Sequence, residues 1–487
     1  MMRSLKWMAR CAVGTALAAC ATAPPTIGGV AGAPPRPESF WTPPASVTPP
    51  DRAPPAPRSP LPTPAALSQL TLSAVVDLAL RNNPATRISW SQARAAADMY
   101  GASRAPLYPV ISGAVTAGQS QAASSGGIGV ERSQFGPSVT LSQLVLDFGG
   151  RSGAIETARQ TAIAADFTHN ATVQNTILVV ETAAFTYLAT RALRDAERSA
   201  IAEATANLAA AEERHRVGLA TIADVLQART ARAQQALNLE TLEGQLKVAR
   251  GVVATAMGFP ATVEVDMPDV VAPDSTTVRV VAASVDSIID VAVRNRPDLA
   301  AARADGARAA AQLQIARGSL WPSLSVGGST SYTNSSVSNF TGRSYALSIG
   351  LSIPIFAGFS RDYAISAAAE GVETANARSE AARRQIELQV FTSYTALQTA
   401  TGRVRTSAEL LASAEASDSV ALGRYTEGVG SIVDLLIAQS ALADARAQSV
   451  GARWQWRTLL ALLAHDAGVL GIHGESLVPL SPNPGGG

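Results

Sequence analysis

The sequence predicts an α+β membrane protein built from an internal tandem repeat, with four β-strands and two pairs of unusually long helices. Two observations indicate the repeat. Arg81-Asn82-Asn83-Pro84 returns 213 positions later as Arg294-Asn295-Arg296-Pro297, and Gly218-Leu219-Ala220-Thr221 returns 210 positions later as Gly428-Val429-Gly430-Ser431. A third observation indicates the helices. No proline occurs between Pro137 and Pro260, or between Pro354 and Pro479. Proline breaks helix interiors, so helices can run far in both stretches.

The first 19 residues are predicted to be a secretory signal peptide, with Arg3 and Lys6 before a short apolar stretch. The signal ends in Leu17-Ala18-Ala19-Cys20, which resembles the lipobox of bacterial lipoproteins. Cys20 would then become the first mature residue and carry a covalent lipid that includes palmitate. The alternative is an ordinary signal peptide cleaved nearby, with Cys20 incidental. The only other cysteine, Cys11, lies inside the signal, so the mature chain has one cysteine and cannot form an internal disulfide.

Proline-rich residues 20–66 are predicted to be the lipid anchor and an extended tether, and residues 471–487 a C-terminal tail. Charged residues make up 16% of the chain and the net charge is +1, so no nucleic-acid partner is indicated. No stretch of about 20 residues is apolar and free of charge, and we therefore expect no transmembrane helix. A chain of this kind that spans a membrane must do so as a closed β-barrel.

Each copy opens with helices. Apolar residues have helical spacing from Leu72 to Leu80 and from Val285 to Val293. Pro84 and Pro297 interrupt these helices, and alanine-rich helix then resumes to about Ser103 and Gly318. Tyr108-Pro109 and its counterpart Trp321-Pro322 end the helical pattern.

Four strands follow these helices, two in each copy. They are predicted at residues 110–118, 138–146, 323–333 and 345–353, with Ser/Gly/Asn-rich loops at 119–134 and 334–343. The alternation of apolar and small residues is clearest from Tyr345 to Ile353, and its length suits a tilted strand that crosses a bilayer. The alternative is a soluble sandwich with one wet face. Four strands are too few for a sandwich or for a barrel of their own, so this sheet needs partners to close it.

Two helices of about 65 residues are predicted at 151–216 and 360–427, each roughly 100 Å long. Each turns at a glycine motif and returns as a helix of about 40 residues. Such helices must lie side by side as coiled coils or as a helical cylinder. The repeats are thus placed at 67–260 and 284–470, joined by a proline-interrupted linker at 261–283 that is expected to form a small mixed equatorial region.

Several motifs in this order resemble the TolC/OprM family of bacterial outer-membrane efflux ducts, over roughly Leu70 to Gly468. The resemblance rests on the doubled helix, YP/WP and strand pattern, and on the doubled turn, clearest from Arg424-Tyr425 to Asp434-Leu435-Leu436. Phe148-Gly149-Gly150-Arg151 and residues 356–361 look like that family's junction between strand and long helix. The resemblance implies a homotrimer. Four β-strands per subunit would contribute to a trimeric 12-stranded β-barrel, and the helices to a long α-helical coiled-coil barrel in the periplasm.

The same resemblance places Asp224 and Asp434 at the periplasmic aperture, together with Gly218, Gly428, Thr221 and Ser431. Asp434 matches the family's pore-lining position. The arginine that some members carry in the preceding turn is replaced here by Gly430 or Ser431. A structural role is also open, because Thr221-Ile222-Ala223-Asp224 and its counterpart at 431–434 have the form of a helix capping box. Gly218 and Gly428 are expected to be left-handed residues that end helices.

No motif indicates catalysis. The four histidines, His169, His215, His465 and His473, lack metal-ligand spacing, and we expect His169 and His215 to be solvated helix residues. The glycine-rich Ser125–Gly129 stretch lacks the strand-to-helix context of a nucleotide site and is predicted to be a loop. Trp454 and Trp456 are predicted to pack within a helical bundle. We expect no cofactor beyond the lipid at Cys20.

The predicted function, implied by the resemblance, is a passive outer-membrane duct of a tripartite efflux system that exports drugs or other small molecules. Its partners would be outer-membrane lipid, a periplasmic adaptor that grips the helical ends, and an inner-membrane transporter. One alternative is the exit duct of a type I protein-secretion system. A second, from a different class, is a periplasmic adaptor lipoprotein, which would instead need a single hairpin flanked by mirrored halves.

Overall fold

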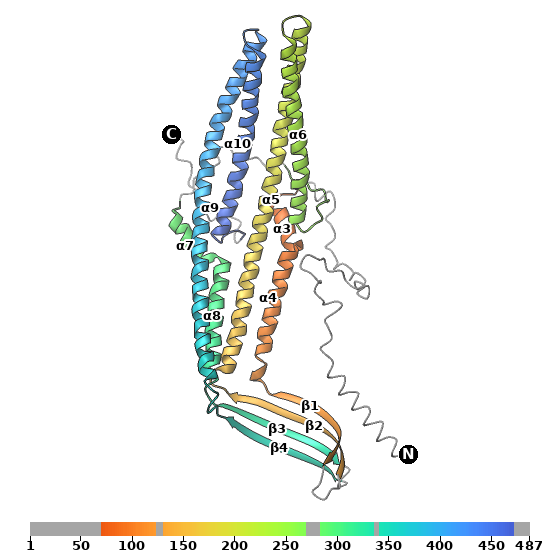
Figure 1. Cartoon of the computed structure of the whole chain (residues 1–487), viewed down its shortest axis with the longest axis vertical. Coiled ribbons are helices and arrows are strands. Elements are labelled where there is room, and N and C mark those ends of the chain that lie inside the picture. Colours follow the sequence, from red (N-terminus) through yellow and green to blue (C-terminus); the bar gives the residue numbers. More distant parts are fainter. Residues whose placement is uncertain (1–69, 123–129, 269–282, 336–339, 472–487) are drawn as a thin grey trace, which may run out of the picture. The chain divides into compact units, whose positions relative to one another are not determined.

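A computed structural model describes residues 70–122, 130–268, 283–335 and 340–471 (Figure 1). The predicted signal peptide, Cys20, the tether, most of the 261–283 linker, the Ser125–Gly129 stretch and His473 lie outside the described residues.

The described elements follow one order twice. In the first half, α3 (Leu72–Asn82) and α4 (Pro84–Ser103) lead through the short η1 (Ala105–Leu107) into β1 (Val110–Ala122) and β2 (Val130–Leu146). The long α5 (Gly150–Arg216) and its return helix α6 (Ile222–Ala256) follow. The second half has α7 (Val285–Asn295), α8 (Pro297–Gly318), β3 (Ser323–Ser335), β4 (Phe340–Ser352), α9 (Ser360–Thr426) and α10 (Ile432–Asp466).

Helix ends agree closely with the sequence prediction. Pro84 and Pro297 are the first residues of α4 and α8, where the missing amide hydrogen costs nothing. The two long helices have 67 residues each. The return helices have 35 residues each, fewer than the 40 or so expected, because Gly258 and Gly468 take positive φ angles (84° and 72°) just past their ends.

The four strands form one antiparallel sheet in the order β1-β2-β3-β4. They are longer than predicted, so the outer parts of the predicted loops at 119–134 and 334–343 were wrong. Gln119, for example, pairs with Ser133, and Asn334 pairs with Thr341. The ends of these strands are polar and are stabilised by backbone pairing with the neighbouring strand. The prediction relied on alternation of apolar residues, which polar strand ends do not show.

The sheet has no hydrophobic core of its own. Within the described part of the chain, none of the four clusters of buried apolar residues contains a strand residue. On β4, Tyr345 and Leu347 are each 86% exposed, and Ile349 and Leu351 on the same face are also exposed. β1 and β4 are the two edges of the sheet. One subunit by itself therefore leaves an apolar face of the sheet and two strand edges uncovered.

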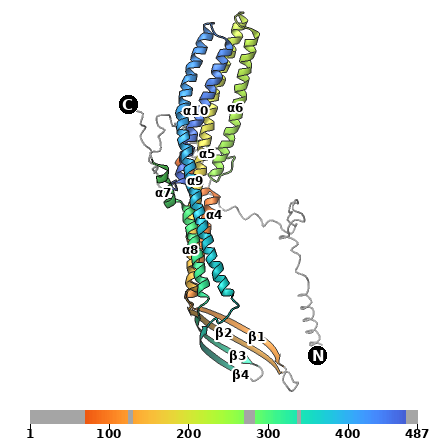
Figure 2. The ribbon, with the colours of Figure 1, turned by 60° about the vertical axis from the view of Figure 1, so that its left-hand side comes forward.

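The helices lie side by side in two tiers (Figures 1 and 2). Nearer the sheet, α4 packs on α5, α5 on α8, and α8 on α9. Beyond α3 and α7, α6 packs on α5, α5 on α10, and α10 on α9. The largest core cluster joins α3, α5 and α6 around Val75, Val180 and Val253, and the next joins α7, α9 and α10 around Ile288, Val390 and Leu463.

One helix differs from the sequence expectation on membrane spans. A window of α5 is long and apolar enough to cross a membrane by composition, although none was predicted. Nearly half of that window (44%) is buried in protein, and residues such as Val180, Ala184 and Leu188 of α5 belong to the main core. A core helix passes the same compositional test, so this observation alone does not make α5 a membrane span.

Candidate functional site

Two helix-turn-helix segments form the candidate site, which we call the tip. Residues 214–227 run from the end of α5 into the start of α6, and residues 424–437 run from the end of α9 into the start of α10. Both long helices end in the same way. Gly218 and Gly428 have φ angles of 79° and 76°, which confirms the predicted left-handed conformation. The amide of Leu219 donates to the carbonyl of Arg214 (2.8 Å), and that of Val429 to the carbonyl of Arg424 (3.0 Å). These bonds cap the final carbonyl groups.

The return helices begin differently in the two halves. At Thr221 the capping box is complete: its hydroxyl accepts from the Asp224 amide (3.3 Å), and the Asp224 carboxylate accepts from the Thr221 amide (2.7 Å). At Ser431 only the first bond forms, from the Asp434 amide to the serine hydroxyl (3.1 Å). The capping prediction is therefore confirmed in full for Thr221–Asp224 and by half for Ser431–Asp434.

The two aspartates consequently have different environments. Asp224 is partly buried and its carboxylate is used by the cap. Asp434 is exposed, and its carboxylate has no hydrogen-bond or ion-pair partner among the residues that the structure describes. An exposed carboxylate without a partner can attract cations from the solvent, whereas a carboxylate bonded in a helix cap mainly stabilises its helix.

Arg214 and Tyr425 join the two halves of the tip, and the sequence did not single out Arg214. Its guanidinium lies over the Tyr425 ring, 4.7 Å from the centroid, and donates to the Tyr425 carbonyl (2.6 Å). Tyr425 is 7% exposed and packs with Val225 and Leu435, and burial raises the pKa of its phenol. The only sequence signal was that Arg214 aligns with Arg424 in the repeat.

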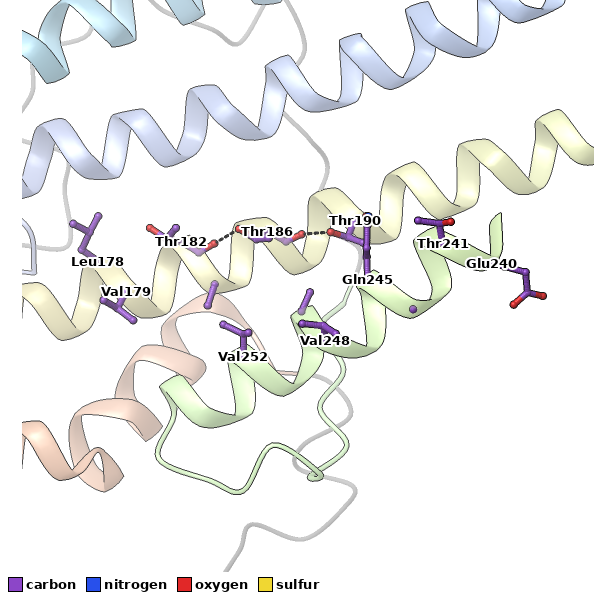
Figure 3. Close-up of a pocket in the computed structure, with 13 residues that line it drawn as sticks. Leu178, Val179, Thr182, Thr186, Thr190, Glu240, Thr241, Gln245, Val248 and Val252 are labelled. Atoms are coloured by element: carbon purple, nitrogen blue, oxygen red, sulfur yellow. Dashed lines mark hydrogen bonds between the residues drawn. The ribbon is translucent and has the colours of Figure 1, made fainter. Parts of the chain in front are cut away.

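A groove of 980 Å³ runs between α5 and α6, away from the tip (Figure 3). Thr182, Thr186 and Thr190 line its α5 side at one residue per turn, and Val248 and Val252 line its α6 side. The hydroxyls of Thr186 and Thr190 donate to the carbonyls one turn earlier (2.8 Å each). Their hydrogen-bonding capacity is thus largely used within the helix, and the groove presents mainly methyl groups.

The corresponding groove between α9 and α10 is smaller, at 410 Å³. Gly244 of α6 lines the larger groove, whereas the residue aligned with it in the repeat, Trp454 of α10, does not line the smaller one. Trp454 is buried with its ring centroid 6.2 Å from that of Phe185 on α5. Around Gly244 the space is open, because a methyl group added to this glycine would meet no atom within 4 Å. The packing prediction for Trp454 and Trp456 is confirmed, and the Trp456 indole donates to the Thr401 hydroxyl (3.1 Å).

A buried ion pair fixes the base of the second hairpin. Arg296, 7% exposed, lies 3.5 Å from the buried Asp466 carboxylate. It also donates to the Asp466 carbonyl (3.3 Å) and to the half-exposed Asp298 carboxylate (2.7 Å). Burial raises the pKa of Asp298, but the hydrogen bonds and charge of Arg296 outweigh it and leave that pKa below its ordinary value. In the first half Asn83 takes the place of Arg296, and its amide donates to the Ala256 carbonyl (3.1 Å).

The histidines form no metal site among the described residues, where no group of three or more His, Cys, Asp or Glu side chains could hold an ion. His215 is exposed, as expected. His169 differs from its expected solvated state, because it is partly buried and its Nδ1 lies 2.8 Å from the Ser89 hydroxyl. His465 lies between Asp466 (3.0 Å) and Asn175 (2.8 Å).

Comparisons with known proteins agree with this architecture. The family model described as "Outer membrane efflux protein" matches residues 75–258 and 288–468. Protein CyaE of Bordetella pertussis is 34% identical over 431 residues, which cover 86% of this chain and 89% of CyaE. The pyoverdine export outer membrane protein OpmQ of Pseudomonas aeruginosa is 32% identical over 228 residues, 46% of each chain.

Solved structures show the same fold at lower identity. The CmeC outer membrane channel of Campylobacter jejuni aligns with a TM-score of 0.74 at 16% identity, covering 83% of this chain and 87% of CmeC. The outer membrane protein VceC of Vibrio cholerae aligns with a TM-score of 0.72 at 17% identity, covering 82% and 96%. The family match extends over most of the chain and through both halves, and this chain therefore belongs to the outer membrane efflux protein family and is located in the outer membrane.

Proposed function

We propose that the protein is the outer-membrane exit duct of a tripartite efflux system and passively conducts small molecules from the periplasmic side to the exterior. The observation that carries the proposal is the sheet without a core. Its apolar face and its free edges, β1 and β4, need other copies and lipid to cover them. Three copies, each giving four strands to a 12-stranded barrel, would satisfy both needs.

The helices support the same assembly. Within one copy α10 packs on α5, with Trp454 against Phe185. In the internal repeat α10 corresponds to α6 and α5 corresponds to α9, so the contact of α10 with α5 predicts an equivalent contact of α6 with α9. Within one subunit α6 and α9 lie at opposite ends of the row of helices, so this contact would have to join two subunits. The open groove beside Gly244 is the surface that α9 of a second copy would cover. Thr395, which is exposed on α9, aligns with Phe185 and would face Gly244.

Small molecules are the favoured cargo because the OpmQ proteins of two Pseudomonas species, 32% and 33% identical over the parts matched, are named for pyoverdine export. The type I protein-secretion duct remains the second candidate, because CyaE, which matches over 86% of this chain, is not named for small-molecule export. The adaptor alternative is disfavoured by membership of the channel family. Lipidation at Cys20, an adaptor that binds the tip and an inner-membrane transporter complete the proposal.

Site-directed crosslinking tests the assembly. The variant carrying Gly244→Cys and Thr395→Cys should form disulfide-linked trimers in outer membranes on mild oxidation. The natural sequence has only Cys11 and Cys20, and Cys11 would leave with the predicted signal peptide. A control pair, Gly244→Cys with Glu373→Cys farther along α9, should stay monomeric under denaturing conditions. A soluble monomer after removal of the lipid would contradict the duct and support the adaptor. Planar-bilayer recordings of the purified trimer then test conduction.

A further inference from the structure

The two hairpins of the sheet have the same register. β1 pairs with β2 so that Gly113 lies opposite Val139, and β3 pairs with β4 so that Val326 lies opposite Ile349. Val326 follows Gly113 by 213 positions, and Ile349 follows Val139 by 210. These are the offsets of the sequence repeat, so each half contributes one copy of the same hairpin. Within the subunit the two hairpins are joined through β2 and β3 (Figure 1).

The two free edges are the counterparts of the two joined strands. β4 corresponds to β2 and β1 corresponds to β3, so pairing of β4 with β1 would repeat the joint that the subunit already contains. Four strands are too few to close on themselves, and the β1 edge must then come from a second subunit. Ser138 of β2 lies opposite Ser331 of β3. Their counterparts, 210 positions later and 213 positions earlier, are Ser348 and Gly118.

We propose that β4 of one subunit pairs antiparallel with β1 of the next, with Ser348 opposite Gly118 and Ile349 opposite Ala117. The inference rests on the proposed duct, whose sheet needs other copies to close it, and adds the register of the seam between subunits. Register sets the stagger of the strands, and the stagger fixes their tilt in a closed barrel.

The faces of the two edge strands match in this register. Pairing across the sheet places Leu347 of β4, Leu141 of β2 and Ile111 of β1 on one face. Alternate residues of a strand share a face, so Leu351 and Val115 lie there too. The proposed register sets these two residues directly opposite each other, and both are exposed in one subunit (61% and 67%). A shift of one residue would turn the apolar face of β4 toward the other face of β1.

The helix ends next to the sheet show an exchange of large and small residues. Within the subunit α5 packs on α8, and a methyl group added to the buried Gly153 would lie 2.8 Å from Ile315. The counterparts are Tyr363 of α9, which is 75% exposed, and Ala102 of α4, which is also exposed. The large residue has changed sides, and each pair keeps one large and one small member. The same packing of α9 on α4 of a second subunit therefore has room for Tyr363.

A second position, one turn earlier on the long helices, shows the same exchange. A methyl group added to Gly149 would lie 3.2 Å from the Nε2 of Gln314. The counterparts are Phe359, which is 64% exposed, and Gly101, where an added methyl group would meet no atom within 4 Å. Two exposed aromatic residues at the start of α9 thus correspond to glycines, and the residues opposite them on α4 are small.

Cysteine pairs test the register. Ser348→Cys with Gly118→Cys, and Ile349→Cys with Ala117→Cys, should each give covalent trimers when outer membranes are mildly oxidised. Neighbouring pairs of an antiparallel ladder alternate between a shorter and a longer Cα spacing, so the two variants sample both. Two controls represent shifts of two residues in either direction and should stay monomeric on denaturing gels: Ser348→Cys with Thr116→Cys, and Gly350→Cys with Gly118→Cys.

Each outcome of the crosslinking decides a different point. A control pair that links subunits as well as the pairs in register would overturn the proposal, and so would a disulfide formed within one subunit. If both pairs in register fail while Gly244→Cys with Thr395→Cys still links trimers, the duct stands and the register is wrong. If none of these pairs links subunits, the proposed assembly of the duct fails as well.

The size exchange gives a readout that needs no disulfide. Ala102→Ile should cut the trimer fraction several-fold, because it sets two large side chains against each other. Adding Tyr363→Gly restores one large and one small member, as in the Gly153–Ile315 pair, and should return the trimer fraction to near the wild-type level. This rescue also shows that the Ala102→Ile chain folds. Normal assembly of Ala102→Ile, or no rescue by Tyr363→Gly, would show that α9 does not pack on α4 in this way.

Discussion

The different bonding of Asp224 and Asp434 predicts that removing each carboxylate will have a different consequence. Asp224→Ala removes the acceptor of the Thr221 amide and the favourable charge at the start of α6. Together these should cost the first turn of α6 about 1.5 kcal/mol. Asp434→Ala leaves the bond to the Ser431 hydroxyl in place and loses the charge term alone, about 0.5 kcal/mol.

Hydrogen exchange and conductance separate the two roles. The amides of residues 221–225 should exchange about tenfold faster in Asp224→Ala, and those of 431–435 only about twofold faster in Asp434→Ala. Asp224→Asn keeps an acceptor and should recover part of the loss. In planar bilayers Asp434→Ala should instead change ion conductance and reduce cation preference, and Asp224→Ala should do neither. Equal loosening of both turns, with unchanged cation preference in Asp434→Ala, would refute this assignment.

Three further predictions concern packing and are tested by thermal unfolding of the purified protein in detergent. Arg296→Ala should destabilise the protein by about 3–5 kcal/mol, because it leaves the buried Asp466 carboxylate (6% exposed) without the Arg296 cation. The counterpart variant Asn83→Ala should cost about 1 kcal/mol. Equal losses would contradict a buried ion pair. Gly258→Ala should cost more than about 2 kcal/mol, since a methyl group there would lie 2.7 Å from the Asn82 carbonyl oxygen, and Gly218→Ala, with similar φ but open space, should lose less. Burial raises the pKa of Glu181 above its ordinary 4.5, so its stabilising protonated form is lost as pH rises through the raised pKa. Glu181→Gln should therefore raise the melting temperature at pH 7 and leave it unchanged below pH 4, and a gain that persists at low pH would argue against this cause.

Local chemistry made most of the fold predictable from sequence. Pro84 and Pro297 mark helix starts, Gly218 and Gly428 mark helix ends, and uninterrupted alanine-rich sequence predicts the long helices. These signals act within a few residues of the feature they define. The ends of the strands were harder to predict, because they are defined by hydrogen bonds to the neighbouring strand and not by an alternation of apolar residues.

The candidate site was predictable only in outline. Asp224 and Asp434 have the same sequence context, and only side-chain conformation separates the complete cap from the half cap. The stacking of Arg214 on Tyr425 depends on two helix ends that are 211 positions apart in sequence. No local pattern encodes such a contact. Lipidation of Cys20 lies outside the described residues and stays a prediction.

The matched lengths of the long helices restrict how this chain can vary in length. α5 and α9 have 67 residues each, and α6 and α10 have 35. A single inserted residue in α5 would raise its turn by about 1.5 Å and rotate every later side chain by about 100° against α10. Arg214 would then miss Tyr425. Insertions and deletions should accordingly be accepted in the segments between paired strands, and within a helix only when all the adjoining helices change together.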